Sequence, residues 1–210
     1  MELIRPLGLV TPTLDGDVLG RLALADAAFT PGELRRLIPA ASVDGIRRVL
    51  NRLVAQGTVS MSRAGSANVY RLNRDHLAAP AIIELASLRA TVIQKIAETI
   101  DRWETPTPFA AMFGSWARGT ATTDSDLDLF IVRPSGAADD VWEHQVAELE
   151  RSATGWTGND ARALVLQEAQ VIARPEDPIL TSVAREGIVL AGPQDWLASL
   201  LTAQPTRRRG

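Results

Sequence analysis

Residues 109–132 read FAAMFGSWARGTATTDSDLDLFIV, and this stretch decides the fold of the C-terminal half of the chain. An apolar run from Phe109 to Phe113 leads into a Gly-Ser turn. A polar connection follows, and two acids then open a second apolar run. Short apolar runs bounded by turn residues are typical of buried strands. The stretch therefore predicts two strands joined by a small-residue turn and a polar loop.

Asp126 and Asp128 stand two residues apart at the start of the second run. Side chains alternate between the faces of a strand, so both carboxylates are expected on one face, about 7 Å apart along it. Leu127 and Leu129 are then expected to face a core. Two carboxylates on one face suit Mg²⁺, or Mn²⁺ in its place, together with substrate phosphates. Two such ions about 3.5–4 Å apart clamp the attacking and leaving oxygens of an in-line displacement.

Gly114 and Ser115 form the turn between the two runs. Glycine has no Cβ, so the backbone can come close to a ligand at this point. Serine offers a backbone N–H and a hydroxyl to a phosphate oxygen. If residues 116–119 make a helical turn, their N–H groups favour an anion at the same place. The turn therefore predicts a grip on the phosphates of a nucleoside triphosphate.

The order of hydrophobic strand, Gly-Ser, ten residues and Asp-x-Asp resembles the signature of polymerase-β-type nucleotidyltransferases, in their minimal branch. The resemblance covers about residues 105–192. It implies an α/β domain with a mixed sheet, a triphosphate held by Gly114 and Ser115, and divalent metal held by Asp126 and Asp128. It also implies an NTP substrate, with ATP as the expected donor.

The same family has a third carboxylate on a neighbouring strand, which completes the metal site and takes part in catalysis. That strand follows a helix, expected here over residues 138–152, and Asp160 at the start of the next apolar run is the candidate. Glu168, beyond the end of that run, is the alternative. Arg118 lies in a frequent variant of the Gly-Ser loop, where it either contacts phosphate or braces the loop through a nearby aspartate, Asp124 or Asp126.

The first third of the chain carries a different pattern. Helices are expected over residues 17–27, 30–38 and 42–57, and a hairpin over residues 58–72. Thr30 and Glu33 match a capping box, with proline at the first helical position. Ser42 is the expected cap of the third helix.

The succession of three helices and a hairpin resembles the winged helix-turn-helix of ArsR-like bacterial regulators, over about residues 14–75. In that plan the third helix enters the major groove of DNA. Arginine suits guanine edges and phosphates, and asparagine suits adenine. A solvated helix face, or a surface that docks a protein, would carry the same residue types. The residues that match the DNA-binding role are Arg47, Arg48, Asn51, Arg52 and, in the wing, Arg63.

Charge is divided unevenly along the chain. Residues 1–80 hold ten arginines against seven acids, a balance of +3, and the remaining residues balance to −6. This asymmetry favours nucleic-acid contact by the first part alone. The chain has no cysteine, no signal-peptide pattern and no apolar run long enough to cross a bilayer. A cytoplasmic protein without membrane contact is expected.

We therefore expect an α+β chain with four parts: a winged helix-turn-helix over residues 1–77, a connector helix over 78–104, a nucleotidyltransferase domain over 105–195, and a helix end with a basic tail over 196–210. The wide apolar face of the connector suits either its own domain or a homodimer. The resemblance implies transfer of AMP to a hydroxyl, first of all on a HEPN-type partner protein of a toxin–antitoxin pair. The alternatives are an aminoglycoside-like small-molecule acceptor and a transcription regulator that senses nucleotide without catalysis.

Overall fold

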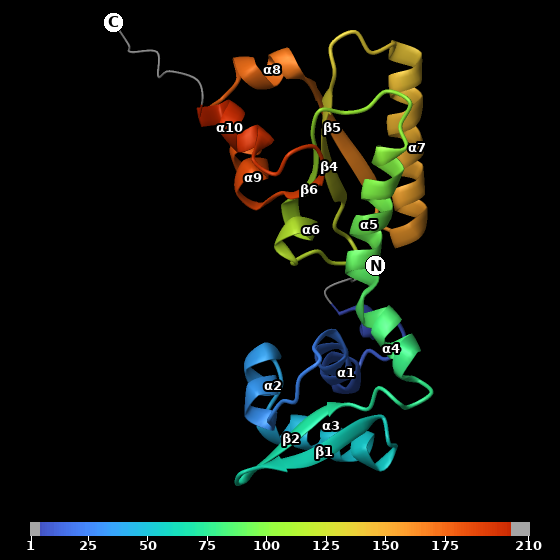
Figure 1. Cartoon of the computed structure of the whole chain (residues 1–210), viewed down its shortest axis with the longest axis vertical. Helices are drawn as coiled ribbons and strands as arrows, with labels where there is room; N and C mark the ends of the chain where they lie inside the picture. Colours follow the sequence, from blue (N-terminus) through green and yellow to red (C-terminus); the bar gives the residue numbers. More distant parts are fainter. Residues whose placement is uncertain (1–4, 203–210) are drawn as a thin grey trace, which may run out of the picture. The chain divides into compact units, whose positions relative to one another are not determined.

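The computed structural model describes residues 5–202, and the chain divides between Ala90 and Thr91 into two compact units (Figure 1). The expected basic tail, Arg207 to Gly210, lies outside the described residues. Within residues 5–202, none of the helices combines the length and the apolar character that a membrane crossing requires.

The N-terminal unit consists of helices and one hairpin. Three α-helices precede an antiparallel pair of strands, in the order that the sequence predicts. The hairpin is paired from Val59 with Leu72 to Ala64 with Ala67, and Gly65 lies in its turn with a φ of 62°. The elements are η1 (Pro6–Leu9), α1 (Leu14–Leu24), α2 (Pro31–Leu37), α3 (Val43–Ala55), β1 (Val59–Ala64), β2 (Ala67–Leu72) and α4 (Ala79–Ala86).

Local capping signals fix the starts of α2 and α3. The Thr30 backbone N–H donates to Glu33 Oε2 at 2.7 Å, and the Glu33 N–H donates back to Thr30 Oγ1 at 3.2 Å, which confirms the capping box. Ser42 Oγ accepts from the Gly45 N–H at 3.0 Å. These bonds satisfy N–H groups that the first helical turn leaves without partners. The apolar faces of the helices then meet in one core around Leu22, Leu34, Ile46 and Leu50.

The expected connector helix is not continuous. Two helices, α4 and α5 (Leu88–Asp101), replace it, and a turn at Ser87 separates them. Ala79 and Ala86 of α4 are buried in the core of the N-terminal unit. The apolar side of α5, with Val92, Ile96 and Ile100, is also buried. Part of the apolar stripe that suggested a homodimer is therefore buried within the two units, and the homodimer stays a prediction.

The C-terminal unit is built on a four-stranded sheet in the order β5-β4-β3-β6. The β4–β5 pair is parallel and the other two pairs are antiparallel, which confirms the expected mixed sheet. After α5 the elements are β3 (Ala110–Phe113), α6 (Gly114–Arg118), β4 (Leu127–Arg133), α7 (Asp139–Thr157), β5 (Ala161–Gln167), α8 (Glu168–Ala173), α9 (Pro178–Glu186), β6 (Ile188–Ala191) and α10 (Trp196–Thr202).

Helices cover both faces of this sheet. Helices α5 and α7 lie on one side, and α8, α9 and α10 lie on the other (Figure 1). Successive side chains of β4 point to opposite faces of the sheet, and so toward the two helical layers in turn. Phe130 and Val132 pack with Leu180 of α9 and Leu197 of α10. By the period of a strand, Asp126 and Asp128 belong to this same face, at the end where β4 begins.

Candidate active site

Asp126 and Asp128 lie where the sequence places them. β4 begins at Leu127, so Asp126 directly precedes the strand and Asp128 is its second residue. Leu127 and Leu129 are completely buried, as expected for the opposite face. Burial raises the pKa of Asp128 above its ordinary value, and the negative charge of Asp126 raises it further. Two ionised carboxylates in this setting repel each other unless a cation lies near them.

Gly114 brings the Gly-Ser turn against Asp128. Phe113, the last residue of β3, pairs with Asp128 of β4, so the turn leaves β3 beside this carboxylate. Gly114 has a φ of 69°, and a Cβ added there would lie 2.5 Å from Asp128 Oδ2. Only glycine fits both the left-handed backbone and the close carboxylate. Ser115 follows in the short helix α6, and its carbonyl accepts from the Thr120 N–H at 2.9 Å.

Arg118 braces the site through a residue that the sequence did not single out. Its Nη1 donates to Glu186 Oε1 at 2.7 Å, so the ion pair joins α6 to the end of α9. Neither Asp124 nor Asp126 is this partner. Ser182 donates to the same Glu186 oxygen at 2.8 Å. The Ser182 hydroxyl, followed by Arg118, lowers the pKa of Glu186. The bracing contact expected through Asp124 or Asp126 is therefore replaced by one that ties the loop to α9 through Glu186.

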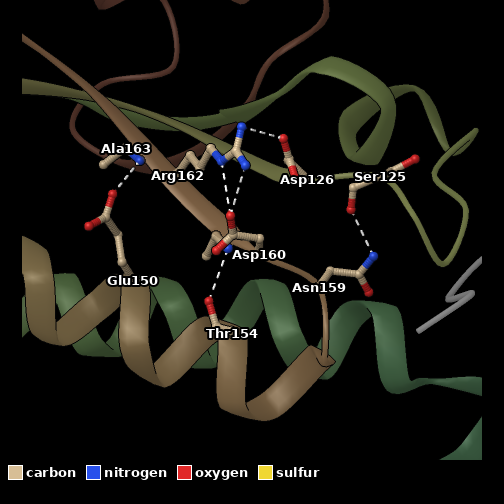
Figure 2. A network of polar contacts seen from close by, with 9 residues as sticks. Ser125, Asp126, Glu150, Thr154, Asn159, Asp160, Arg162 and Ala163 are labelled. Atoms are coloured by element: carbon tan, nitrogen blue, oxygen red, sulfur yellow. Dashed lines mark hydrogen bonds and ion pairs between the residues drawn. The ribbon is translucent and has the colours of Figure 1, made fainter.

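Asp160 and Arg162 lie beside the two acids of β4. In the parallel register Leu127 pairs with Ala161 and Asp128 pairs with Arg162. Arg162 Nη1 lies 2.9 Å from Asp126 Oδ2. Its Nε and Nη2 donate to Asp160 Oδ2 at 3.0 and 2.9 Å. Figure 2 shows the guanidinium lying between the two carboxylates. The structure therefore brings Asp160 to the site, with an arginine between it and Asp126.

A third metal ligand does not emerge from this arrangement. Within residues 5–202, no group of three or more Asp, Glu, His or Cys side chains is placed to hold a metal ion. Glu168, the alternative, opens α8 after β5 has ended. It lies six positions after Arg162, which corresponds to about 20 Å of extended chain. Glu168 is therefore at the wrong end of the sheet, and the metal-binding role of Asp160 stays a prediction.

Asn159 supports the site, although no local sequence pattern indicated this role. The residue is buried, at 2% exposure, two positions before β5 begins. The amide Nδ2 donates to the carbonyls of Thr122, Thr123 and Ser125 at 3.1, 3.1 and 2.7 Å. The contact with Ser125 is drawn in Figure 2. This one amide therefore binds three carbonyls of the loop that precedes Asp126. A polar residue between a helix end and an apolar run was the only signal in the sequence.

The donor set fits a hard divalent cation. Asp126 and Asp128 supply carboxylate oxygens from one face, and the partial burial of Asp128 makes a compensating positive charge favourable. Mg²⁺ commonly binds through one or two carboxylates and completes its shell with water and substrate phosphates. Asp126 and Asp128 are the residues that would hold it, with the Gly114–Ser115 turn next to them.

The predicted DNA-binding residues form an exposed face on the N-terminal unit. Arg47, Arg48, Asn51 and Arg52 of α3 are all exposed, as is Arg63 of the hairpin. Arg47 pairs with Asp44 at 3.1 Å on the same helix, and Arg52 pairs with Asp15 of α1 at 2.5 Å. A cavity of about 520 Å³ lies between the start of α2, Arg47 and Asn51 of α3, and residues 66–68 of the hairpin.

Comparisons with known proteins assign the class of the C-terminal unit. Residues 93–168 match the family model of the nucleotidyltransferase domain, and this segment contains the Gly-Ser turn, Asp126 and Asp128. The C-terminal unit therefore carries a nucleotidyltransferase domain, and the predicted enzyme class is confirmed. Comparison with curated proteins gives no match.

Two solved structures resemble about half of the chain. One is described as a toxin–antitoxin with AMP-PNP, and the other as a mutant of the toxin–antitoxin MntA-HpeT. Each is 17% identical, over 52% of this chain and 81% of its own, with TM-scores of 0.39 and 0.40 respectively.

Proposed function

We propose that the chain moves a nucleoside monophosphate, with ATP as the expected donor, onto a hydroxyl of a protein, and that its N-terminal unit binds DNA. The observation that carries the first part is the placement of Gly114 directly against Asp128, with Asp126 beside it. This geometry joins a turn that can take phosphate to a pair of carboxylates that calls for a cation.

Each residue of the site has a defined task in this reaction. The Ser115 hydroxyl and the N–H groups of the turn bind the distal phosphates, and Asp126 and Asp128 would hold Mg²⁺. A bound divalent ion would neutralise charge on the phosphates. The acceptor oxygen forms a bond to the α-phosphorus, the bond to the bridging oxygen of the β-phosphate breaks, and pyrophosphate leaves. The hydroxyl proton passes to solvent or to a nearby carboxylate.

Label transfer tests this proposal. The full chain is incubated with ATP labelled at the α-phosphate, Mg²⁺ and candidate acceptors, including a HEPN-type protein if one is encoded beside this chain. The expected result is label on the acceptor, lost in Asp128→Asn. Asp101→Asn, an exposed acid at the end of α5, is the matched control and should keep full transfer. Nucleotide binding with no transfer to any acceptor would instead favour the nucleotide-sensing regulator.

The DNA-binding part is supported by the open basic face of α3 and by the cavity between α3 and the hairpin. A recognition helix needs exposed side chains that can bind base edges, and Arg48 and Asn51 are exposed on α3. A gel shift on DNA from upstream of the gene, at low salt, is the direct test. No shift under these conditions would leave the arginines as a solvated surface or a protein-docking face.

A further inference from the structure

Arg162 lies beside Asp128 on the neighbouring strand, the strand on which the resemblance implies a third carboxylate. It is the register partner of Asp128 on the neighbouring strand, and it shares the strand face that carries Asp126 and Asp128. Instead of adding negative charge, it places a guanidinium among three aspartates. An arginine guanidinium keeps its proton throughout the working pH range of an enzyme. The side chain is therefore a permanent cation in the site.

The backbone around Arg162 is held firmly although β5 lies at the edge of the sheet. The Ala161 N–H donates to Thr154 Oγ1 at 3.0 Å, and the Ala163 N–H donates to Glu150 Oε1 at 2.7 Å (Figure 2). Both acceptors belong to α7. They satisfy N–H groups of the outer strand edge that would otherwise face water. Arg162 is therefore presented from a fixed strand, while its side chain remains 64% exposed and accessible to a ligand.

We propose that Arg162 supplies the second positive charge of the active site, so that one divalent ion on Asp126 and Asp128 is sufficient and the guanidinium contacts the triphosphate. This inference rests on the proposed nucleotidyl transfer. A planar guanidinium presents paired donors that match phosphate oxygens. Asp160 is then a positioning residue. It accepts two hydrogen bonds from Arg162 and holds it beside the site, and it is not a metal ligand.

The ion pair with Asp126 gives this inference a measurable consequence. Arg162 and a divalent ion compete for the same Asp126 carboxylate in the absence of nucleotide. Removal of the guanidinium should therefore strengthen binding of the metal ion when no nucleotide is present. Removal also takes away a phosphate contact and so weakens nucleotide binding. A purely structural arginine would not shift the two affinities in opposite directions.

The experiment counts Mn²⁺ bound to the full chain by electron paramagnetic resonance, alone and with α,β-methylene ATP. Wild type is expected to bind one Mn²⁺ with the nucleotide. Arg162→Ala should bind Mn²⁺ alone about threefold more tightly. The same variant should bind the nucleotide about tenfold more weakly, as expected for a lost charge-assisted hydrogen bond. Arg162→Asp, which completes a set of three carboxylates, should raise the count to two.

Matched variants separate this role from general effects of charge. Arg102→Ala removes an exposed arginine of the same unit that pairs with Glu98, and it should change neither affinity. Asp160→Asn should keep Mn²⁺ binding and weaken nucleotide binding, and it should add little to Arg162→Ala in the double variant. Circular dichroism and thermal unfolding of each variant establish that the fold is retained.

Four results would overturn the inference. They are two Mn²⁺ per wild-type chain, loss of Mn²⁺ binding in Asp160→Asn as severe as in Asp126→Asn, affinities in Arg162→Ala equal to those of wild type, and a count of one in Arg162→Asp. A wild-type chain that binds neither Mn²⁺ nor nucleotide would overturn the proposed function itself. The two failures are therefore distinguishable in one set of measurements.

Discussion

The two units of the chain place their charged side chains in opposite ways. In the C-terminal unit, like charges meet: Asp126 and Asp128 lie together, and burial raises the pKa of Asp128. In the N-terminal unit, the arginines of α3 spread over an exposed helix face. The first arrangement costs free energy without a ligand, whereas the second costs little. An unfavourable pair of like charges of this kind indicates a catalytic or binding site more specifically than exposed surface charge does.

Gly114 and Gly119 allow the largest test of this contrast. Gly114 begins α6 and Gly119 follows its last residue, and both have a φ of 69°. A Cβ at Gly114 would meet Asp128 Oδ2, whereas a Cβ at Gly119 would meet nothing within 4 Å. Gly114→Ala should lower the transfer rate about a hundredfold or more. The new Cβ displaces the Asp128 carboxylate or the turn, and the two can then no longer bind the same substrate in the reactive geometry. Gly119→Ala should cost only the backbone strain of about 1–2 kcal/mol in unfolding free energy.

Label transfer and urea unfolding of the two glycine variants make this measurement. Equal transfer rates in Gly114→Ala and Gly119→Ala would show that contact with Asp128 does not matter to the reaction. The site would then have to be placed elsewhere in the unit.

Two buried or half-buried asparagines give a second comparison, because each unit uses one to hold a loop. Asn159 donates to three carbonyls before Asp126, and Asn73 Nδ2 donates to the Gly57 carbonyl at 2.8 Å. Asn159→Ala should lower the unfolding free energy by about 2 kcal/mol and also lower transfer. Asn73→Ala should lower it by about 1 kcal/mol and leave transfer unchanged.

Chemical denaturation and label transfer on both asparagine variants check this expectation. If folded Asn159→Ala transferred label at the wild-type rate, the reaction would not depend on the hydrogen bonds from this amide to the loop. Asn159 would then contribute to stability alone.

The arginines of α3 provide the third test, and the structure ranks them. Arg48 is exposed, whereas Arg52 is engaged by Asp15 of α1, which also has a lowered pKa. Arg48→Ala should weaken DNA binding about tenfold, and Arg52→Ala should weaken it less, since part of the Arg52 charge is already paired. Arg74→Ala, which removes an exposed arginine that pairs with Asp26, is the control.

Fluorescence anisotropy over a range of salt concentrations measures these affinities. Loss of a phosphate contact should also reduce the slope of log affinity against log salt concentration by about one. Equal losses for Arg48, Arg52 and Arg74 would indicate non-specific attraction by net charge and would count against a recognition helix.

Local signals in the sequence predicted most of the fold. The capping box at Thr30, the cap at Ser42 and the apolar runs on either side of Gly114 are read from neighbouring residues, and the structure has the corresponding elements. The interruption of the connector helix at Ser87 was not predicted, because the apolar periodicity of the sequence continues through this residue. Which core each half joins depends on distant contacts.

The acids and the Gly-Ser turn were also predictable from neighbouring residues. Asp126 and Asp128 are two positions apart, and the two-residue period of a strand puts them on one face. Their supporting residues were not. Arg118 finds Glu186 at a sequence separation of 68 residues, and Asn159 reaches the loop before Asp126 from the start of β5. The pairing of Asp128 with Arg162 follows from the parallel register of β4 and β5, which no local pattern contains.

The smallest expected effect is on stability, and it follows from the sign of the pKa shift of Asp128. Burial and the charge of Asp126 raise this pKa above its ordinary value of 3.8 in the folded chain. An acid with a raised folded pKa destabilises the fold wherever it is ionised, and the penalty disappears once pH falls below the unfolded pKa. Asp128→Asn should therefore raise the melting temperature at neutral pH without metal or nucleotide.

That gain should shrink as pH falls through the raised pKa and should vanish below about 3.8, the ordinary value. Asp101→Asn, on the exposed end of α5, should show no comparable gain. Excess Mg²⁺ with nucleotide should reverse the order, because only wild type can then gain binding free energy. A melting temperature for Asp128→Asn below that of wild type at neutral pH, without ligand, would mean that Asp128 stabilises the fold. The paired acids would then need no cation.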